Sequence, residues 1–151
     1  MKLSLLCREV GIDSVIAEPG HPLGPAPQAA GSAGGELDTL LAALGEREIA
    51  EVRDDSRAVQ PGDLFVALPG QSVDGHQYVA DAVARGAAAV VVEHPVELPA
   101  AAGSFVQLQV KSAPQSLAAI AANRYGRPAD VLTLIGITGT NGKTTTNFLV
   151  E

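Results

Sequence analysis

A glycine-rich stretch near the end of the chain, "GITGTNGKTTT", carries residue types that bind phosphate. Gly136, Gly139 and Gly142 allow tight turns and a close approach of the backbone to an anion. A helix that begins near Gly142 would direct its free N–H groups and the positive end of its dipole at that anion. Lys143 would place an ammonium group on the β and γ phosphates, and Thr144 would offer a hydroxyl to Mg²⁺. These residues predict a binding site for nucleotide phosphates.

The glycine spacing departs from the common phosphate-loop pattern G-x-x-x-x-G-K-[ST]. That pattern needs glycine at position 137, where Ile137 stands. A purely structural glycine-rich turn is therefore the alternative interpretation. The context favours phosphate binding, because Gly-Lys-Thr opens a helix directly after an apolar stretch that reads as a strand.

The same stretch resembles the ATP-binding loop of the Mur ligase superfamily, the ATP-dependent amide-bond ligases of peptidoglycan assembly and their folylpolyglutamate synthetase relatives. The resemblance implies ATP and Mg²⁺ as cofactors, with Lys143 as the catalytic residue and Thr144 as the residue that binds the metal. The residues that it places against ATP are Gly139, Thr140, Asn141, Gly142, Lys143, Thr144 and Thr145.

Residues 54–93, "DDSRAVQPGDLFVALPGQSVDGHQYVADAVARGAAAVVVE", resemble the N-terminal domain shared by two types of ligase in this family. One adds the third peptide residue (the MurE type), and the other adds D-Ala-D-Ala (the MurF type). The approach to the loop, "RYGRPADVLTLIGITGTNGKTTT", is more similar to the MurE type. For that type the resemblance implies that ATP phosphorylates the terminal carboxylate of UDP-N-acetylmuramoyl-L-Ala-D-Glu. The amine of meso-diaminopimelate or L-lysine then attacks the acyl phosphate.

The resemblance also implies which residues hold the UDP-sugar: Asp54, Ser56, Gln71, Ser72 and Val73. For Ser56 the alternative is a turn-forming serine beside Asp55. For Arg57 two interpretations have equal support: a contact with a diphosphate and an exposed ion pair.

The other titratable residues of this region predict structure rather than chemistry. Asp74 and His76 are interpreted as a turn and a helix start, not as a catalytic pair. His21 and His94 lie beside prolines in loops and need no function.

The hydrophobic pattern predicts an α/β fold: a small N-terminal α/β domain with a mixed sheet, followed by the truncated start of a P-loop ATP-binding α/β domain. Strands are expected in "EIAEVRDDS", "DLFVAL", "AAAVVVE", "SFVQLQV" and "DVLTLIGIT", and the alternation in "SFVQLQV" predicts a half-buried strand. Helices are expected over 2–9, 37–45, 113–125 and in "HQYVADAVARG". A capping box of Ser112 and Gln115 would open the helix over 113–125. Pro61-Gly62 predicts a type II turn.

The predicted organisation has four parts. They are a divergent N-terminal segment over 1–45 with a flexible Pro/Gly-rich region at 18–36, a UDP-sugar-binding domain over 46–111, a connecting helix and linker over 112–129, and the start of the ATP-binding domain over 130–151. We expect a chain cut inside the ATP-binding domain, with no ligase activity of its own.

The composition excludes several classes of partner and of site. The formal net charge is −7 and the pI about 4.8, with no basic stripe, so a nucleic-acid partner is not expected. The one cysteine, Cys7, excludes an internal disulfide and a Cys-rich zinc site. No signal peptide and no membrane span are evident, which predicts a cytoplasmic monomer without a membrane partner.

Several alternatives stay open beside the MurE type. A MurF-type ligase and a folylpolyglutamate or cyanophycin synthetase are rival enzymes. A non-catalytic UDP-sugar-binding module over 46–111 and an inactive gene product are the non-enzymatic ones. The expected small-molecule partners are the UDP-MurNAc-dipeptide and the diamino acid.

Overall fold

The computed structural model describes residues 1–17, 46–70, 73–98, 105–133 and 136–150. The predicted excursion over 18–36, the helical turns over 37–45, and Gln71 and Ser72 lie outside the described residues. The strands are β1 (Ile12–Ala17), β2 (Val52–Arg53), β3 (Leu64–Val66), β4 (Ala89–Val92) and β5 (Val106–Val110). The helices are α1 (Leu3–Leu6), α3 (Val79–Ala84), α4 (Ala113–Arg124) and α5 (Lys143–Val150), with 3₁₀ turns η1 (Ser56–Ala58), η2 (Gly75–Tyr78) and η3 (Pro128–Asp130).

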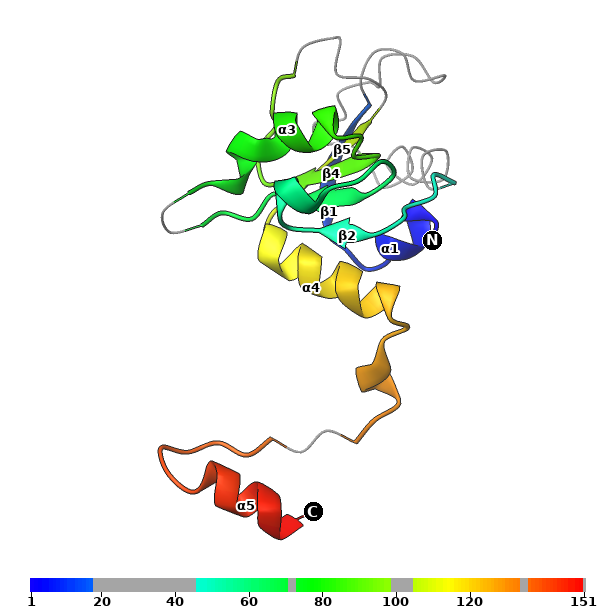
Figure 1. Ribbon diagram of the computed structural model, residues 1–151. Coiled ribbons are helices and arrows are strands. Elements are labelled where there is room, and N and C mark those ends of the chain that lie inside the picture. Colours follow the sequence, from blue (N-terminus) through cyan, green and yellow to red (C-terminus); the bar gives the residue numbers. More distant parts are fainter. Residues whose placement is uncertain (18–45, 71–72, 99–104, 134–135, 151) are drawn as a thin grey trace.

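The strands form one sheet in the order β1-β5-β4-β3-β2 (Figure 1). β2, β3, β4 and β5 are parallel, whereas β1 pairs with β5 in the antiparallel direction. The predicted mixed sheet is therefore confirmed. β3 and β4 are interior strands, which explains why their residues are apolar on both faces.

Helices cover both faces of this sheet. One core lies between the sheet and the helices α1 and α4, and it includes Leu3, Leu64 and Ile120. The other core lies on the α3 side and includes Phe65 and Val79. Figure 1 shows α3 on one side of the sheet and α1 and α4 on the other. The body of the protein is thus a three-layer α/β/α arrangement.

The sequence pattern did not predict β1, which forms one edge of the sheet. The first residues of the chain are held against the residues before β2, because Met1 and Ile49 exchange backbone hydrogen bonds and Leu3 N donates to Arg47 O. Residues 1–17 and α4 therefore belong to the same folded body as the predicted unit over 46–111.

The prediction of a half-buried β5 is wrong. Gln107 is 2% exposed, and Val96 N donates to its Oε1 at 3.2 Å. The segment after β4 covers this face of β5 and gives the buried amide a partner, so polar alternation here does not mean solvent exposure.

The predicted capping box at the start of α4 is also wrong. Ser112 occupies the N-cap position but makes no side-chain capping hydrogen bond. The carboxylate of Glu93 accepts from Ala113 N at 2.8 Å instead. Glu93 lies after β4, twenty residues before the helix that it caps, so no local sequence pattern marks this cap.

The turn at Pro61-Gly62 follows the prediction, and so does the end of the helix predicted in "HQYVADAVARG". Gly62 has φ +91° and Asp63 N donates to Gln60 O, as the predicted type II turn at Pro61-Gly62 requires. Gly86, with φ +95°, ends the helical segment that contains α3.

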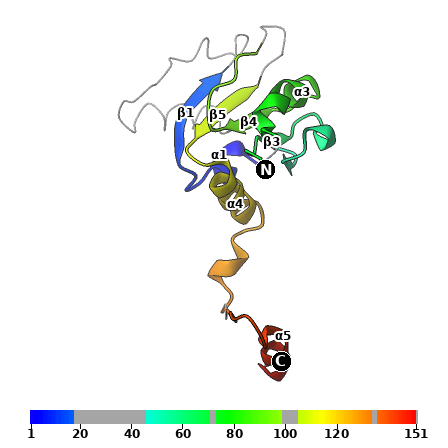
Figure 2. The ribbon, with the colours of Figure 1, turned by 90° about the vertical axis from the view of Figure 1, so that its left-hand side faces the viewer.

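The end of the chain lies apart from this body. Figures 1 and 2 show α5 at the end of an extended stretch that leaves α4, away from the sheet in both views. The predicted strand "DVLTLIGIT" is wrong for its described residues, 130–133 and 136–138, none of which is in a strand. A strand needs a hydrogen-bonded neighbour, and no described strand lies beside this stretch. The predicted helix after Gly142 is present as α5.

No helix in the described part of the chain is long and apolar enough to cross a bilayer.

Candidate functional site

The candidate substrate site lies at the carboxyl ends of β2 and β3. Four parallel strands end at one edge of the sheet, which is where open α/β sheets bind their ligands. The turn η1 begins directly after β2, and η2 begins after the loop that follows β3. The two turns bring together residues that are about twenty positions apart in the sequence.

The first wall of the site is the turn after β2. Asp55 is the N-cap of η1, and its Oδ1 accepts from Arg57 N at 3.0 Å. The same carboxylate accepts from the Arg57 side chain, with Nε–Oδ1 at 2.9 Å and Nη2–Oδ2 at 2.8 Å. These hydrogen bonds lower the pKa of Asp55 to about 2 and raise the pKa of Arg57. Ser56, between them, is 7% exposed. The turn therefore has a fixed shape.

The second wall is the turn after β3. Pro69 and Asp74 form an isolated antiparallel bridge, and Gly75 N donates to Leu68 O at 2.9 Å. A Cβ on Gly75 would lie 2.6 Å from Leu68 O, so only glycine fits this approach. The close return of the chain at Gly75 places Val73 at the mouth of the site.

A cavity of about 490 Å³ separates the two walls. It is lined by Asp54, Asp55, Ser56, Arg57, Leu68, Val73, Gly75 and Tyr78. Its volume is in the range of small-molecule sites, and it combines apolar side chains with a few polar groups.

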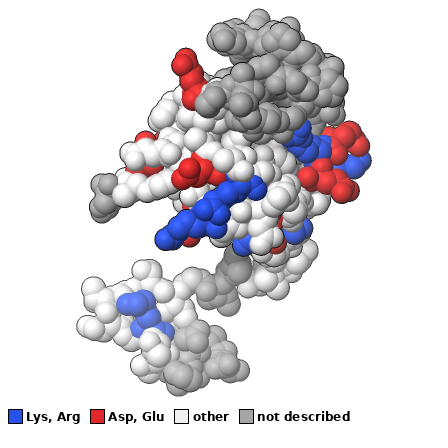
Figure 3. Space-filling view, turned by 45° about the horizontal axis from the view of Figure 1, so that its top comes forward, with Lys and Arg blue, Asp and Glu red and all other residues white. Residues whose placement is uncertain are grey.

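The cavity offers little positive charge. Among the described residues that line the cavity, Arg57 is the one cation, and it lies beside the carboxylates of Asp54 and Asp55. On the face shown in Figure 3, basic and acidic side chains lie next to one another. An anionic ligand would therefore depend on Arg57 and on hydrogen bonds more than on the field of the whole protein.

The Asp-Gly-His segment beside this cavity is a turn and a helix start, as predicted. Asp74 is the N-cap of η2, and its Oδ1 accepts from His76 N at 3.0 Å. This backbone hydrogen bond, followed by one from the His76 side chain, lowers the pKa of Asp74. His76 is buried, and Glu93 N donates to its Nε2 at 2.9 Å.

The phosphate loop lies on the separate stretch before α5. Gly139 and Gly142 have φ of +146° and +80°, so both use backbone conformations that favour glycine. Lys143 Nζ donates to Gly139 O, and Thr146 N and Oγ1 contact Gly142 O at 2.9 and 3.0 Å. Residues 139–146 are exposed. Glycine backbone, a helix start and an ammonium group lie together in this turn, and phosphate is bound by donors of these kinds.

The structure brings together part of the predicted substrate set. Asp54, Ser56 and Val73 line one cavity, while Gln71 and Ser72 lie outside the described residues. Sequence reasoning missed Tyr78 as a lining residue. The available signal was its place in the first turn after Asp-Gly-His, because a helix that follows a parallel strand begins at the ligand-binding edge.

Known proteins resemble this chain in sequence and in structure. Residues 48–125 match the Mur ligase family, catalytic domain. A UDP-N-acetylmuramoyl-L-alanyl-D-glutamate--2,6-diaminopimelate ligase from Ectopseudomonas mendocina is 52% identical over 102 residues, which make up 68% of this chain and 21% of that protein. The ligase of the same name from Chlorobaculum tepidum is 48% identical over 132 residues, 80% of this chain and 25% of that protein. Crystal structure I of MurF from Acinetobacter baumannii aligns with TM-score 0.50 and 37% identity, covering 65% of this chain and 20% of that one.

The chain thus spans only about a fifth to a quarter of the length of these curated relatives.

Proposed function

Because the chain belongs to the Mur ligase family, we propose that it forms the nucleotide-sugar-binding part of an ATP-dependent ligase of peptidoglycan synthesis. The proposed reaction adds a diamino acid, meso-diaminopimelate or L-lysine, to UDP-N-acetylmuramoyl-L-Ala-D-Glu through an acyl phosphate. A cytoplasmic location is part of this proposal, because the reaction consumes ATP.

The observation that carries the proposal is the cavity between η1 and the turn after β3. Asp54, Ser56 and Val73 come from two separate stretches of sequence and line one space. Arg57 provides a cation for the diphosphate, and Tyr78 provides an aromatic face that is 40% exposed. A pyrophosphate needs charge-assisted hydrogen bonds, and a planar base needs an apolar or aromatic surface. The lining residues offer both.

The phosphate loop supports the ATP part of the proposal. Lys143 and the exposed backbone of residues 139–142 would hold the phosphates, and Thr144 would contribute its hydroxyl to Mg²⁺. When bound, ATP and Mg²⁺ supply the phosphoryl group and the charge neutralisation that activate a carboxylate for attack by an amine. Lys143 would act by positioning and by stabilising negative charge.

The names of the relatives favour diaminopimelate as the added amino acid. Two ligases named for 2,6-diaminopimelate are 52% and 48% identical to the chain, whereas MurF from A. baumannii is 37% identical. MurF-type addition of D-Ala-D-Ala is the second candidate, favoured by the structural similarity to that protein.

Titration of the 151-residue chain with UDP-N-acetylmuramoyl-L-Ala-D-Glu, followed by amide chemical shifts, tests the substrate site. We expect shifts in residues 54–57, at Val73 and at Tyr78. Ser56→Ala should weaken binding by about tenfold, as expected for the loss of one hydrogen bond to a bound ligand. Ser112→Ala is the matched control, because Ser112 does not line this cavity. A folded chain without shifts in residues 54–57 would refute the assignment.

A further inference from the structure

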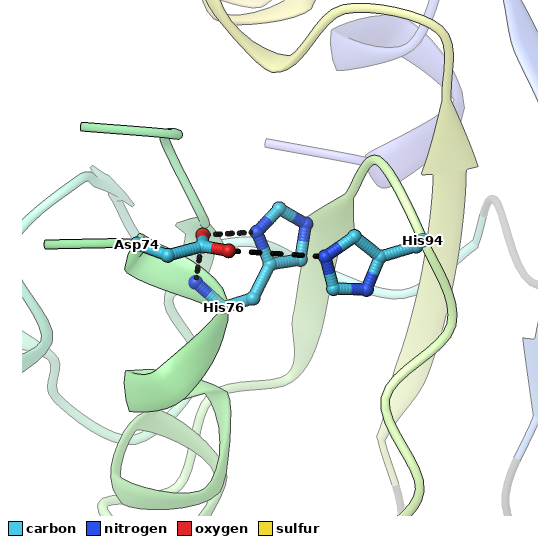
Figure 4. A group of neighbouring side chains, drawn as sticks. All are labelled: Asp74, His76 and His94. Carbon is cyan, nitrogen blue, oxygen red and sulfur yellow. Dashed lines mark hydrogen bonds and ion pairs between the residues drawn. The ribbon is translucent and has the colours of Figure 1, made fainter. Parts of the chain in front are cut away.

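Two histidines and an aspartate meet beside the candidate cavity without lining it (Figure 4). Asp74 and His76 belong to the turn between β3 and α3, and His94 lies in the loop after β4. One possible ligand atom from each residue lies within 4.8 Å of those of the other two. Imidazole nitrogen and carboxylate oxygen are ligands for transition-metal ions.

His76 uses both of its ring nitrogens within the protein. Glu93 N donates to Nε2 at 2.9 Å, so the ring proton belongs on Nδ1, which lies 2.6 Å from Asp74 Oδ1. A metal ion on Nδ1 would move the proton to Nε2, where it would face the Glu93 N–H. Two donors would then oppose each other in a buried place. His76 is therefore a positioning residue for Asp74 and not a ligand.

Asp74 has one oxygen committed and the other available. Its Oδ1 accepts from the backbone N and from the ring Nδ1 of His76. Its Oδ2 faces His94 Nε2 at 3.9 Å. The side chains of Asp74 and His94 are 43% and 61% exposed, so a hydrated ion can reach both atoms.

The ring of His94 is held in place by stacking. Its centroid lies 3.9 Å from that of His76, with an angle of 17° between the rings. Because His76 is buried and hydrogen-bonded at both nitrogens, it gives His94 a fixed surface to lie on. Figure 4 shows the His94 nitrogen directed at the Asp74 carboxylate across this stack.

We propose that Asp74 Oδ2 and His94 Nε2 bind a divalent transition-metal ion, with Zn²⁺ as the best chemical match. In a tetrahedral site, bonds of about 2.0–2.2 Å from one ion to a nitrogen and an oxygen place the two ligand atoms about 3.3–3.6 Å apart. The observed 3.9 Å therefore has to shorten by a few tenths of an ångström, which a small rotation of the exposed His94 side chain provides. His76 supplies the outer-shell hydrogen bond that ligating carboxylates commonly have.

Water would complete the coordination shell of this ion. Mg²⁺ and Ca²⁺ prefer shells made wholly of oxygen, so the mixed nitrogen and oxygen pair selects against them. This site is separate from Thr144, the residue proposed for the Mg²⁺ that accompanies ATP. An ion held here would join the turn after β3 to the loop after β4 and stabilise the folded state.

The test is a titration of the 151-residue chain with ZnCl₂, followed by calorimetry and by ¹⁵N shifts of the histidine rings. We expect one saturable site, a shift of the His94 Nε2 resonance, and His76 with its proton still on Nδ1. Asp74→Asn and His94→Ala should each weaken zinc binding at least tenfold. MgCl₂ at a hundredfold excess should not displace the zinc.

Two control variants separate this site from general zinc affinity. Asp81→Asn removes an exposed carboxylate of α3, and His21→Ala removes the histidine outside the described residues. Neither should change the zinc affinity by more than about twofold. Zinc binding that survives His94→Ala, that is lost in His21→Ala, or that moves the His76 proton to Nε2 would overturn the proposal.

Discussion

Glu93 Oε1 accepts a hydrogen bond from the backbone N of Ala113 at 2.8 Å, so the residue after β4 caps the first turn of α4. The backbone of Glu93 makes two further contacts: its N donates to His76 Nε2, and its O accepts from Gln109 Nε2 at 3.2 Å. One residue thus connects the Asp-Gly-His turn, β5 and α4.

Removal of this cap should destabilise the protein. We expect Glu93→Ala to lower the free energy of unfolding by about 1–2 kcal/mol, because a helix N-terminal donor would lose its acceptor. Ser112→Ala should change it by less than about 0.5 kcal/mol, since Ser112 makes no capping hydrogen bond. Urea unfolding of both variants provides the measurement. A larger loss of stability in Ser112→Ala than in Glu93→Ala would contradict this assignment and would favour a local capping box at Ser112.

The turn that forms the second wall of the cavity depends on Gly75. A Cβ there would lie 2.6 Å from Leu68 O and 2.7 Å from Leu68 N, both backbone atoms. Gly75→Ala should therefore cost at least about 2 kcal/mol in thermal or urea unfolding, as overpacking against backbone does. Gly11→Ala is the matched control, because a Cβ there meets nothing within 4 Å. Equal stability of the two variants would show that the turn is free to move.

The hydrogen bonds between Asp55 and Arg57 predict an unusually low pKa for the Asp55 side chain. The hydrogen bonds from Arg57 lower the pKa of Asp55 to about 2, below its usual 3.8. Because the folded pKa is depressed, the contribution of Asp55 to stability is present above about pH 4 and is lost as the pH falls through about 2. NMR titration of the Asp55 side chain should show a midpoint near about 2. Arg57→Gln removes the guanidinium hydrogen bonds and should raise the pKa of Asp55 towards its usual 3.8, whereas Arg124→Gln should not.

The thiol of Cys7 should be unreactive in the folded protein. Burial raises the pKa of Cys7 to about 12, so the nucleophilic thiolate is absent at neutral pH. We expect no reaction with a disulfide reagent at pH 8 until the protein is unfolded in urea. Rapid labelling of the native chain would mean that α1, which precedes Cys7, opens readily.

The interior of the sheet could be predicted from sequence because its signals are local. Leu64–Val66 and Ala89–Val92 are apolar runs of strand length between turn residues, and both are buried strands. Asp54 and Ser56 were identified through a motif, and the structure places them at one cavity with Val73.

The edge strand β1 could not be predicted, because a bulge hides its period. The register between β1 and β5 shifts between Ile12 and Ser14, which leaves Asp13 as an extra residue. Ile12 and Val15 both pack on the core although they are three positions apart, so the alternation of a regular strand is absent. The Glu93 cap and the covered face of β5 escaped prediction for a similar reason, because both depend on contacts distant in sequence.

The phosphate loop contains the residue types that bind phosphate, but few contacts with the rest of the described structure hold these residues in position. Among the described residues 136–146, the hydrogen bonds stay within the stretch, from Lys143 and Thr146 to Gly139 and Gly142. The helix α5 has eight residues, fewer than the roughly 12–15 at which an isolated helix becomes marginally stable in water. ATP would therefore have to order the loop and the helix as it binds, at about 1–2 kcal/mol for each residue that becomes fixed.

We expect no measurable ATP affinity for the 151-residue chain at low millimolar nucleotide with Mg²⁺. In a chimera that continues residue 151 with the remainder of the E. mendocina relative, neighbouring strands would support the loop, and ATP should bind. Lys143→Ala should abolish that binding, whereas Lys111→Ala, at the end of β5, should leave it unchanged. Calorimetry on both proteins makes the comparison. Micromolar, Lys143-dependent binding of ATP by the 151-residue chain itself would show that the loop is already ordered without the support of a sheet.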